Sequence, residues 1–129
     1  MKVPSWIAPV FYAAALYDGI LGVLGTILPV RLYTLFGAAL PDHMGYVHFP
    51  ALLLILVSIM FYNIAKDPIA NKNLIFYGIL AKIAYCVVVL GYLLFGNIPS
   101  MWVPFAILDL LFIALFILAG RAVNQLGVG

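Results

Sequence analysis

Three ionisable side chains stand inside apolar stretches of this sequence, and they are the residues best suited to chemistry. Asp18 lies in LYDGILGVLG, Lys82 in ILAKIAYC and Asp109 in AILDLLF. If these stretches cross a membrane, each charge costs about 2.5–3.5 kcal/mol near the centre of its helix. We therefore expect all three side chains to face the interior of a helix bundle, where they pair or lose their charge.

The depth of these residues in the membrane and the direction of their side chains indicate how the charges pair. At about 1.5 Å rise per residue, all three lie about 12–16 Å from the same side of the membrane. Helical side chains lean toward the N-terminus of their helix, so Asp18 and Lys82 are expected to lean together and Asp109 away from them. We predict Asp18–Lys82 as the closer pair. Asp109 is then the extra acid, and we expect it to hold a proton.

The surroundings of these charges suggest what they do. Tyr85 shares the helix face of Lys82, while Ala14, Gly22 and Gly25 share that of Asp18 and predict close helix packing. Asp18, Lys82, Asp109 and Tyr85 are the candidates for a proton relay, or for a polar pocket that holds a lipid-like ligand such as a quinone. The alternative is a buried polar cluster that only fixes the helix register.

A second polar group occurs in PDHMGYVHFP, which contains Asp42, His43 and His48. Acid and imidazole side chains can bind a transition metal, but this spacing matches no established metal site. We expect Asp42 and His43 to form a solvated turn and His48 to anchor a helix at the membrane surface. The sequence has no GxSxG, HExxH, P-loop or GxGxxG motif. We therefore assign no catalytic residue, and an enzyme is the less favoured interpretation.

The composition of the chain predicts that these residues lie in a membrane rather than in a soluble domain. The chain has 129 residues, of which 67% are hydrophobic and 8% charged, whereas soluble domains carry about 25% charged residues. A chain this short and this apolar lacks the polar surface to cover a core, so the bilayer is its expected solvent. The net charge of +2 comes without a basic run, which argues against nucleic acid as a partner.

Four apolar runs are long enough to cross a membrane as helices, and they predict one all-α, four-helix integral membrane domain over residues 1–129. The first run exceeds the ~7–15 apolar residues of a signal peptide, so we interpret it as a span. Between the first two spans, PVRLYTLFG predicts a short interfacial helix that ends at Gly37. The predicted spans cover residues 7–28, 46–65, 74–95 and 101–120.

Basic residues predict the orientation of these spans. Lys2, Lys66, Lys72 and Arg121 fall on the side that holds both termini and the 66–73 loop, while Arg31 falls on the other side. Cytoplasmic loops carry the excess of Lys and Arg. We therefore expect a multi-pass protein of the inner (plasma) membrane with both termini in the cytoplasm.

A short repeat predicts how the spans associate. YTLFG at residues 33–37 recurs as YLLFG at residues 92–96, and a proline-containing loop and a proline-led apolar span follow each copy. The repeat predicts two helix pairs, spans 1–2 and spans 3–4, related by an axis along the membrane normal. The alternative is a chance match between two apolar sequences.

With four spans, a small size and polar residues within the spans, the chain resembles the DoxX-like group of small bacterial membrane proteins. That resemblance implies an accessory or quinone-proximal role in the membrane, and it transfers no catalytic residue. The acid at Asp18 also resembles the glutamate that the small multidrug resistance transporters carry in their first span, although here Lys82 compensates the acid.

The leading hypothesis is a non-enzymatic accessory subunit or lipid- or quinone-pocket protein, in a larger membrane complex or a homo-oligomer. The alternative is a small proton-coupled transporter that works as an oligomer.

Overall fold

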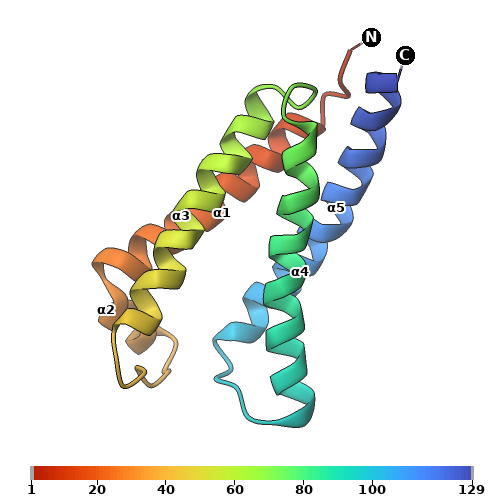
Figure 1. Ribbon diagram of the computed structural model, residues 1–129. Coiled ribbons are helices and arrows are strands. Elements are labelled where there is room, and N and C mark those ends of the chain that lie inside the picture. Colours follow the sequence, from red (N-terminus) through yellow and green to blue (C-terminus); the bar gives the residue numbers. More distant parts are fainter. Residues whose placement is uncertain (1, 129) are drawn as a thin grey trace.

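The computed structural model describes residues 2–128, which form helices and no strand. Four helices are long and apolar enough to cross a membrane, and a fifth, short helix follows the first of them. This confirms the predicted four-helix membrane bundle (Figure 1). The helices are α1 (Ile7–Ile27), α2 (Pro29–Leu35), α3 (Gly45–Lys66), α4 (Lys72–Phe95) and α5 (Trp102–Val128).

The observed helix ends agree with the predicted spans within two residues, except at the end of α5. That helix continues to Val128, whereas the predicted span stops at residue 120. Arg121, Asn124 and Gln125 end the apolar run there. They do not end the helix, because polar side chains leave the backbone hydrogen bonds of a helix intact, and residues 121–126 contain no proline.

The short helix α2 begins and ends as its sequence predicts. Pro29 occupies the first turn, where a missing backbone N–H costs little. After the helix, Gly37 has a positive φ of 67°. Its N–H donates to the Thr34 carbonyl (3.0 Å), and the Ala38 N–H donates to the Tyr33 carbonyl (2.9 Å). These two bonds form a Schellman motif, which ends the helix at a glycine.

The four long helices form two pairs, α1 with α3 and α4 with α5 (Figure 1), as the repeat predicts. The first pair is packed closely: a Cβ added to Gly22 would lie 2.7 Å from the Ala51 carbonyl oxygen. The Ser58 hydroxyl also donates to the Ala15 carbonyl across this pair (2.5 Å). The repeated pentapeptides differ in structure, because residues 33–37 leave α2 through a turn whereas residues 92–95 are the last turn of α4.

The two pairs meet at the end of the molecule that holds both termini and diverge toward the other end (Figure 1). At the meeting point the rings of Phe11, Phe61 and Phe116, from α1, α3 and α5, lie 4.6–6.2 Å apart. A smaller cluster at the other end contains Tyr33 and Met101, and burial raises the pKa of the Tyr33 hydroxyl. The Asp18, Lys82 and Asp109 side chains lie between these two clusters.

Candidate functional site

Lys82 is the centre of a buried charge cluster built from three helices. Its Nζ donates to both carboxylate oxygens of Asp18 and to Oδ1 of Asp109, each at 2.9 Å. Asp18, Lys82 and Asp109 are 2%, 3% and 5% exposed. An ammonium group has three N–H donors, so these three acceptor atoms satisfy it completely. We call these residues the triad.

The triad confirms one of the predicted pairings and corrects another. Asp18 and Lys82 form an ion pair, as expected, but they are not the closer pair, because Lys82 lies 2.9 Å from both acids. The prediction that Asp109 leans away from Lys82 is wrong, since Asp109 is as close to Nζ as Asp18 is. A flexible four-carbon stem carries the Lys82 ammonium, and α4 packs along α5. The long lysine side chain therefore brings Nζ to Asp109, even though the helix direction favours the opposite lean for the shorter aspartate side chain.

Aromatic rings surround the ammonium group. Lys82 Nζ lies 5.2 Å from the ring centroid of Tyr17, 5.4 Å from that of Phe112 and 5.6 Å from that of Phe61. A cation within about 6 Å of a ring face is attracted to it. Sequence reasoning did not find Tyr17 or Phe61. Tyr17 could have been found as the direct neighbour of Asp18, but Phe61 on α3 gives no such signal.

Tyr17 has a polar group without a partner. Its hydroxyl is buried and forms no hydrogen bond within residues 2–128. Its ring lies 6.2 Å from that of Phe105 and 5.8 Å from that of Phe112, which are four residues before and three after Asp109. The Tyr17 ring therefore lies in the same layer as the triad. A buried hydroxyl without a partner is rare and calls for an explanation.

The structure gives Tyr85, the fourth candidate, a partner outside the triad. Its hydroxyl donates to the Trp102 carbonyl at 3.0 Å, and the two rings lie 6.2 Å apart. One residue further along α4, the Cys86 thiol donates to the Ala106 carbonyl at 3.5 Å. Both contacts fasten α4 to the first turns of α5.

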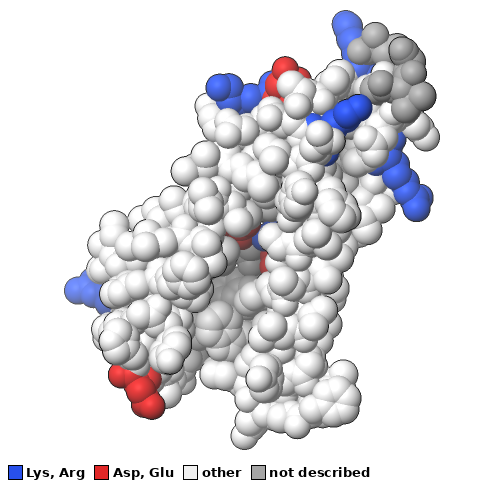
Figure 2. Space-filling view, viewed as in Figure 1, with Lys and Arg blue, Asp and Glu red and all other residues white. Residues whose placement is uncertain are grey.

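A hollow separates α3 from α4 on the face shown in Figure 2. It opens toward the end of the molecule where the helix pairs diverge. Red and blue atoms are visible at its closed end, while its walls are white. The triad supplies the buried acidic and basic atoms of the bundle, so the hollow gives access to the edge of the triad.

The histidine segment does not form a comparable site. Asp42 and His43 are exposed, and His43 Nδ1 accepts a hydrogen bond from the Gly45 N–H at 2.9 Å. His48 is half-buried in the first turns of α3. Within residues 2–128, no group of three His, Cys, Asp or Glu side chains is placed to hold a metal ion.

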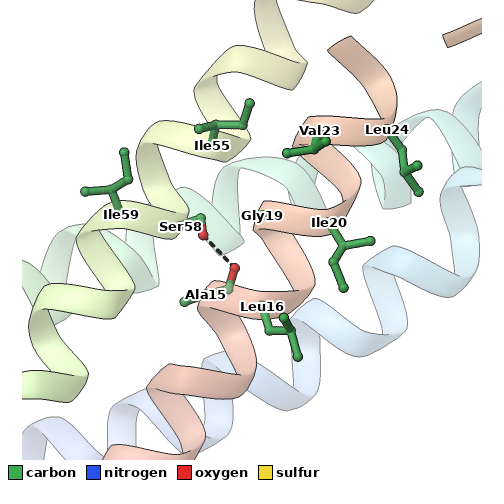
Figure 3. A pocket seen from close by; sticks show the side chains of 9 residues that line it. All are labelled: Ala15, Leu16, Gly19, Ile20, Val23, Leu24, Ile55, Ser58 and Ile59. Atoms are coloured by element: carbon green, nitrogen blue, oxygen red, sulfur yellow. Dashed lines mark hydrogen bonds between the residues drawn. The ribbon is translucent and has the colours of Figure 1, made fainter. Parts of the chain in front are cut away.

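A separate apolar groove of about 480 Å³ runs along α1 and α3 (Figure 3). Its floor includes Gly19 and Ser58, and the Ser58 hydroxyl is already bonded to the Ala15 carbonyl. The exposed side chains of Leu16 and Ile20 border it. Since the groove is apolar and lies on the outer surface of a membrane helix pair, lipid chains suit it.

Comparison with protein-family models, curated proteins and solved structures finds no match to this chain. The similarity to the DoxX-like group therefore stays a prediction. The features that bear on function are the triad, the hollow at its edge (Figure 2) and the buried Tyr17 hydroxyl in the same layer.

Proposed function

We propose that this protein is a non-enzymatic, multi-pass protein of a bacterial inner membrane that holds a lipid-like ligand, such as a quinone, in the hollow beside the triad. It acts there as an accessory subunit of a larger membrane complex or as a homo-oligomer. The observation that carries this proposal is the hollow with uncharged walls and a charged closed end (Figure 2).

The chemistry of the hollow matches an amphipathic ligand. Binding pockets are mostly apolar, with a few polar groups that fix the orientation of the ligand. The Tyr17 hydroxyl can donate to a ligand carbonyl, since it forms no hydrogen bond within residues 2–128. Asp109 bonds Lys82 through Oδ1, which leaves Oδ2 as an acceptor for a ligand hydroxyl. The walls carry no charged side chain (Figure 2), which suits the tail of such a molecule.

The charge distribution supports an orientation with both termini in the cytoplasm. One end of the molecule carries both termini and most of the lysine and arginine side chains (Figure 2). The positive-inside rule favours this end as the cytoplasmic one. The hollow then opens toward the outer leaflet. The DoxX-like resemblance agrees with an accessory, quinone-proximal role.

Native purification tests this proposal. The protein is extracted in a mild detergent and its bound lipids and partner proteins are identified by mass spectrometry. We expect one class of lipid-like molecule to be enriched over bulk lipid, to be lost in Tyr17→Phe and to be retained in Tyr62→Phe. Tyr62 is the matched control, because it is exposed on α3. A bound fraction with the composition of bulk lipid in the wild type would contradict the proposal.

The uneven charge of the triad favours a second candidate, a small proton-coupled transporter that works as an oligomer. Two carboxylates and one ammonium leave a net charge of −1 that a proton can cancel. Proton-dependent uptake into vesicles that contain the protein, lost in Asp109→Asn because an amide cannot cycle a proton, would favour this candidate over the first.

A further inference from the structure

One carboxylate oxygen of the triad has no partner in the protein. Lys82 Nζ donates to both oxygens of Asp18 but only to Oδ1 of Asp109. Within residues 2–128, the Tyr17 hydroxyl is the one buried side-chain oxygen or nitrogen that lacks a hydrogen bond. Asp109 Oδ2 also lacks a bond in this part of the chain. It must therefore be accessible from outside the bundle, although Asp109 is only 5% exposed overall.

This accessible oxygen belongs to the closed end of the hollow. The triad supplies the charged atoms that are visible there (Figure 2). Of its two acids, Asp109 has the more exposed side chain, at 8% against 2% for Asp18. The walls of the hollow carry no charged side chain (Figure 2). A molecule that fills the hollow therefore meets Asp109 Oδ2 with its head group.

The triad offers such a head group an acceptor and no lysine donor. The three N–H groups of Lys82 are all used by the two acids. The Asp109 carboxylate can only accept while it is charged. A head group that donates a hydrogen bond to Oδ2 gains a charge-assisted bond, whereas a head group that only accepts leaves Oδ2 without a partner.

The charge of the triad adds a second condition. Two carboxylates and one ammonium sum to −1, so the closed end repels a carboxylate or a phosphate head group. This repulsion is stronger in the interior of a membrane protein than in water, because the dielectric constant is lower there. Free fatty acids and ordinary phospholipids are therefore disfavoured, while a hydroxyl or an ammonium head group is compatible with the site.

A metal ion is a poor occupant for the same position. Ca²⁺ and Mg²⁺ take about six oxygen ligands, and no group of three His, Cys, Asp or Glu side chains within residues 2–128 is placed to hold an ion. The neighbours of Asp109 on its helix face are instead Phe105 and Phe112, whose rings lie 6.2 and 5.8 Å from that of Tyr17. These aromatic surroundings suit an organic head group.

We propose that the hollow selects lipid-like molecules whose head group donates a hydrogen bond to Asp109 Oδ2, and rejects those whose head group is anionic or only accepts. Asp109 is then the residue that determines specificity. Alcohols, phenols and protonated amines share the required donor. For a quinone, the hydroxyls of the reduced form provide this donor and the carbonyls of the oxidised form do not. This inference rests on the proposed function, because it specifies the ligand of the same hollow.

Competition binding tests the selection with probes that share one alkyl tail. Tritiated dodecanol is bound to the purified protein in a non-ionic detergent at neutral pH, and unlabelled dodecyl methyl ether, dodecylamine or dodecanoate competes with it. The ether keeps the acceptor oxygen of dodecanol but has no donor, so we expect it to bind about ten- to hundredfold more weakly, the range for a hydrogen bond to a charged group. Dodecanoate should not compete. Dodecylamine should compete, and its affinity relative to dodecanol shows whether an ammonium or a hydroxyl is the better donor.

Two matched variants assign the selection to Asp109. Asp109→Asn keeps the shape of the side chain and removes its charge, so it should bring the ether within a few-fold of dodecanol and allow dodecanoate to compete. Asp42→Asn is the control, because it removes an exposed carboxylate from the connection between α2 and α3, and it should bind all four probes as the wild type does. If Asp109→Asn does not fold, the order of the competitors on the wild type decides the question.

The outcomes separate this inference from the proposed function. Saturable binding of dodecanol with an ether or a dodecanoate that competes equally well overturns the inference and leaves the proposed function intact. A preference for dodecanol that persists unchanged in Asp109→Asn also overturns it, because another group would then be the acceptor. If none of the four probes binds saturably, the proposed function fails as well.

Discussion

At the scale of single residues, the three members of the triad are not equivalent. Lys82 has two acidic partners, whereas each acid has one lysine. Removing one acid leaves Lys82 paired with the other. Removing the lysine leaves two carboxylates close together in the membrane interior, with no cation to compensate them.

We therefore predict that Lys82→Met is far more destabilising than either acid variant. Loss of one partner from a buried ion pair costs about 3–5 kcal/mol, and Lys82→Met should reach this range. Asp18→Asn and Asp109→Asn should each cost less, because Lys82 keeps a charged partner. Unfolding in detergent, followed by circular dichroism, measures all three. Adding Asp18→Asn to Lys82→Met should restore part of the loss; equal costs for the three single variants would contradict a shared lysine.

Two tyrosines of the site provide a second prediction, because one hydroxyl has a partner and the other does not. Tyr85→Phe removes the bond to the Trp102 carbonyl and should cost about 1 kcal/mol of unfolding free energy. Tyr17→Phe removes a buried hydroxyl without a partner in residues 2–128, so in ligand-free protein it should cost nothing or stabilise. Thermal unfolding of the two delipidated variants measures the difference. A larger loss for Tyr17→Phe would mean that its hydroxyl does form a bond.

The residues of the triad could be predicted from the sequence, and their full geometry could not. Charge within an apolar run identifies Asp18, Lys82 and Asp109 without any structure. Whether a lysine pairs with one acid or with two depends on the distance between the helices and on the conformation of the lysine side chain. Neither can be inferred from the residues next to it in the sequence. The Phe61 ring reaches Lys82 from a helix whose sequence carries no charge at that depth.

At the scale of the elements, glycine decides how closely α1 and α3 approach. A Cβ at Gly22 would meet the Ala51 carbonyl oxygen and the Ile55 side chain at 2.7 Å each. The backbone of Ala51 cannot move aside without shifting its helix. A Cβ at Gly91, on α4, would meet nothing within 4 Å. The two glycines have the same local conformation and differ only in their neighbours.

We predict opposite effects for the two alanine substitutions. Gly22→Ala should destabilise by about 1–3 kcal/mol, the usual cost of overpacking. Gly91→Ala should stabilise by about 0.5–1 kcal/mol, since it removes only the conformational cost of glycine in a helix. Unfolding midpoints in the same detergent test both variants. An unfolding midpoint of Gly22→Ala equal to that of the wild type would contradict the close packing of α1 against α3.

The elements themselves follow from simple patterns, with one instructive exception. Apolar length gives the four spans within two residues at most ends, and Gly37 gives the end of α2. The last eight residues of α5 escape this reasoning. The length of an apolar run indicates how much of a helix lies in the bilayer, whereas the end of the helix is set by backbone hydrogen bonding. A helix whose backbone hydrogen bonds are not interrupted therefore extends beyond its apolar run, as α5 does through Gly120.

At the scale of the whole molecule, the bundle is two helix pairs joined by the Phe11–Phe116 contact at one end and the Tyr33–Trp102 contact at the other, with the triad between them. The end with the Phe11–Phe116 contact carries both termini and the connection from α3 to α4 (Figure 1). Lys66 ends α3 and Lys72 begins α4 at this end, whereas Arg31 lies on α2 at the other. The hollow therefore opens on the side of the molecule that is poor in basic residues.

This asymmetry predicts the orientation of the protein in its membrane. Because Lys and Arg are retained on the cytoplasmic side, the end with both termini should face the cytoplasm, and the hollow should open toward the opposite leaflet. Reporter proteins fused after residue 129 or inserted in the 66–73 connection should both report a cytoplasmic location. A reporter inserted in the loop between α4 and α5, at residue 97, is the control and should report the opposite side. A cytoplasmic signal at residue 97 would reverse the orientation, and protons would then reach the triad from the cytoplasm.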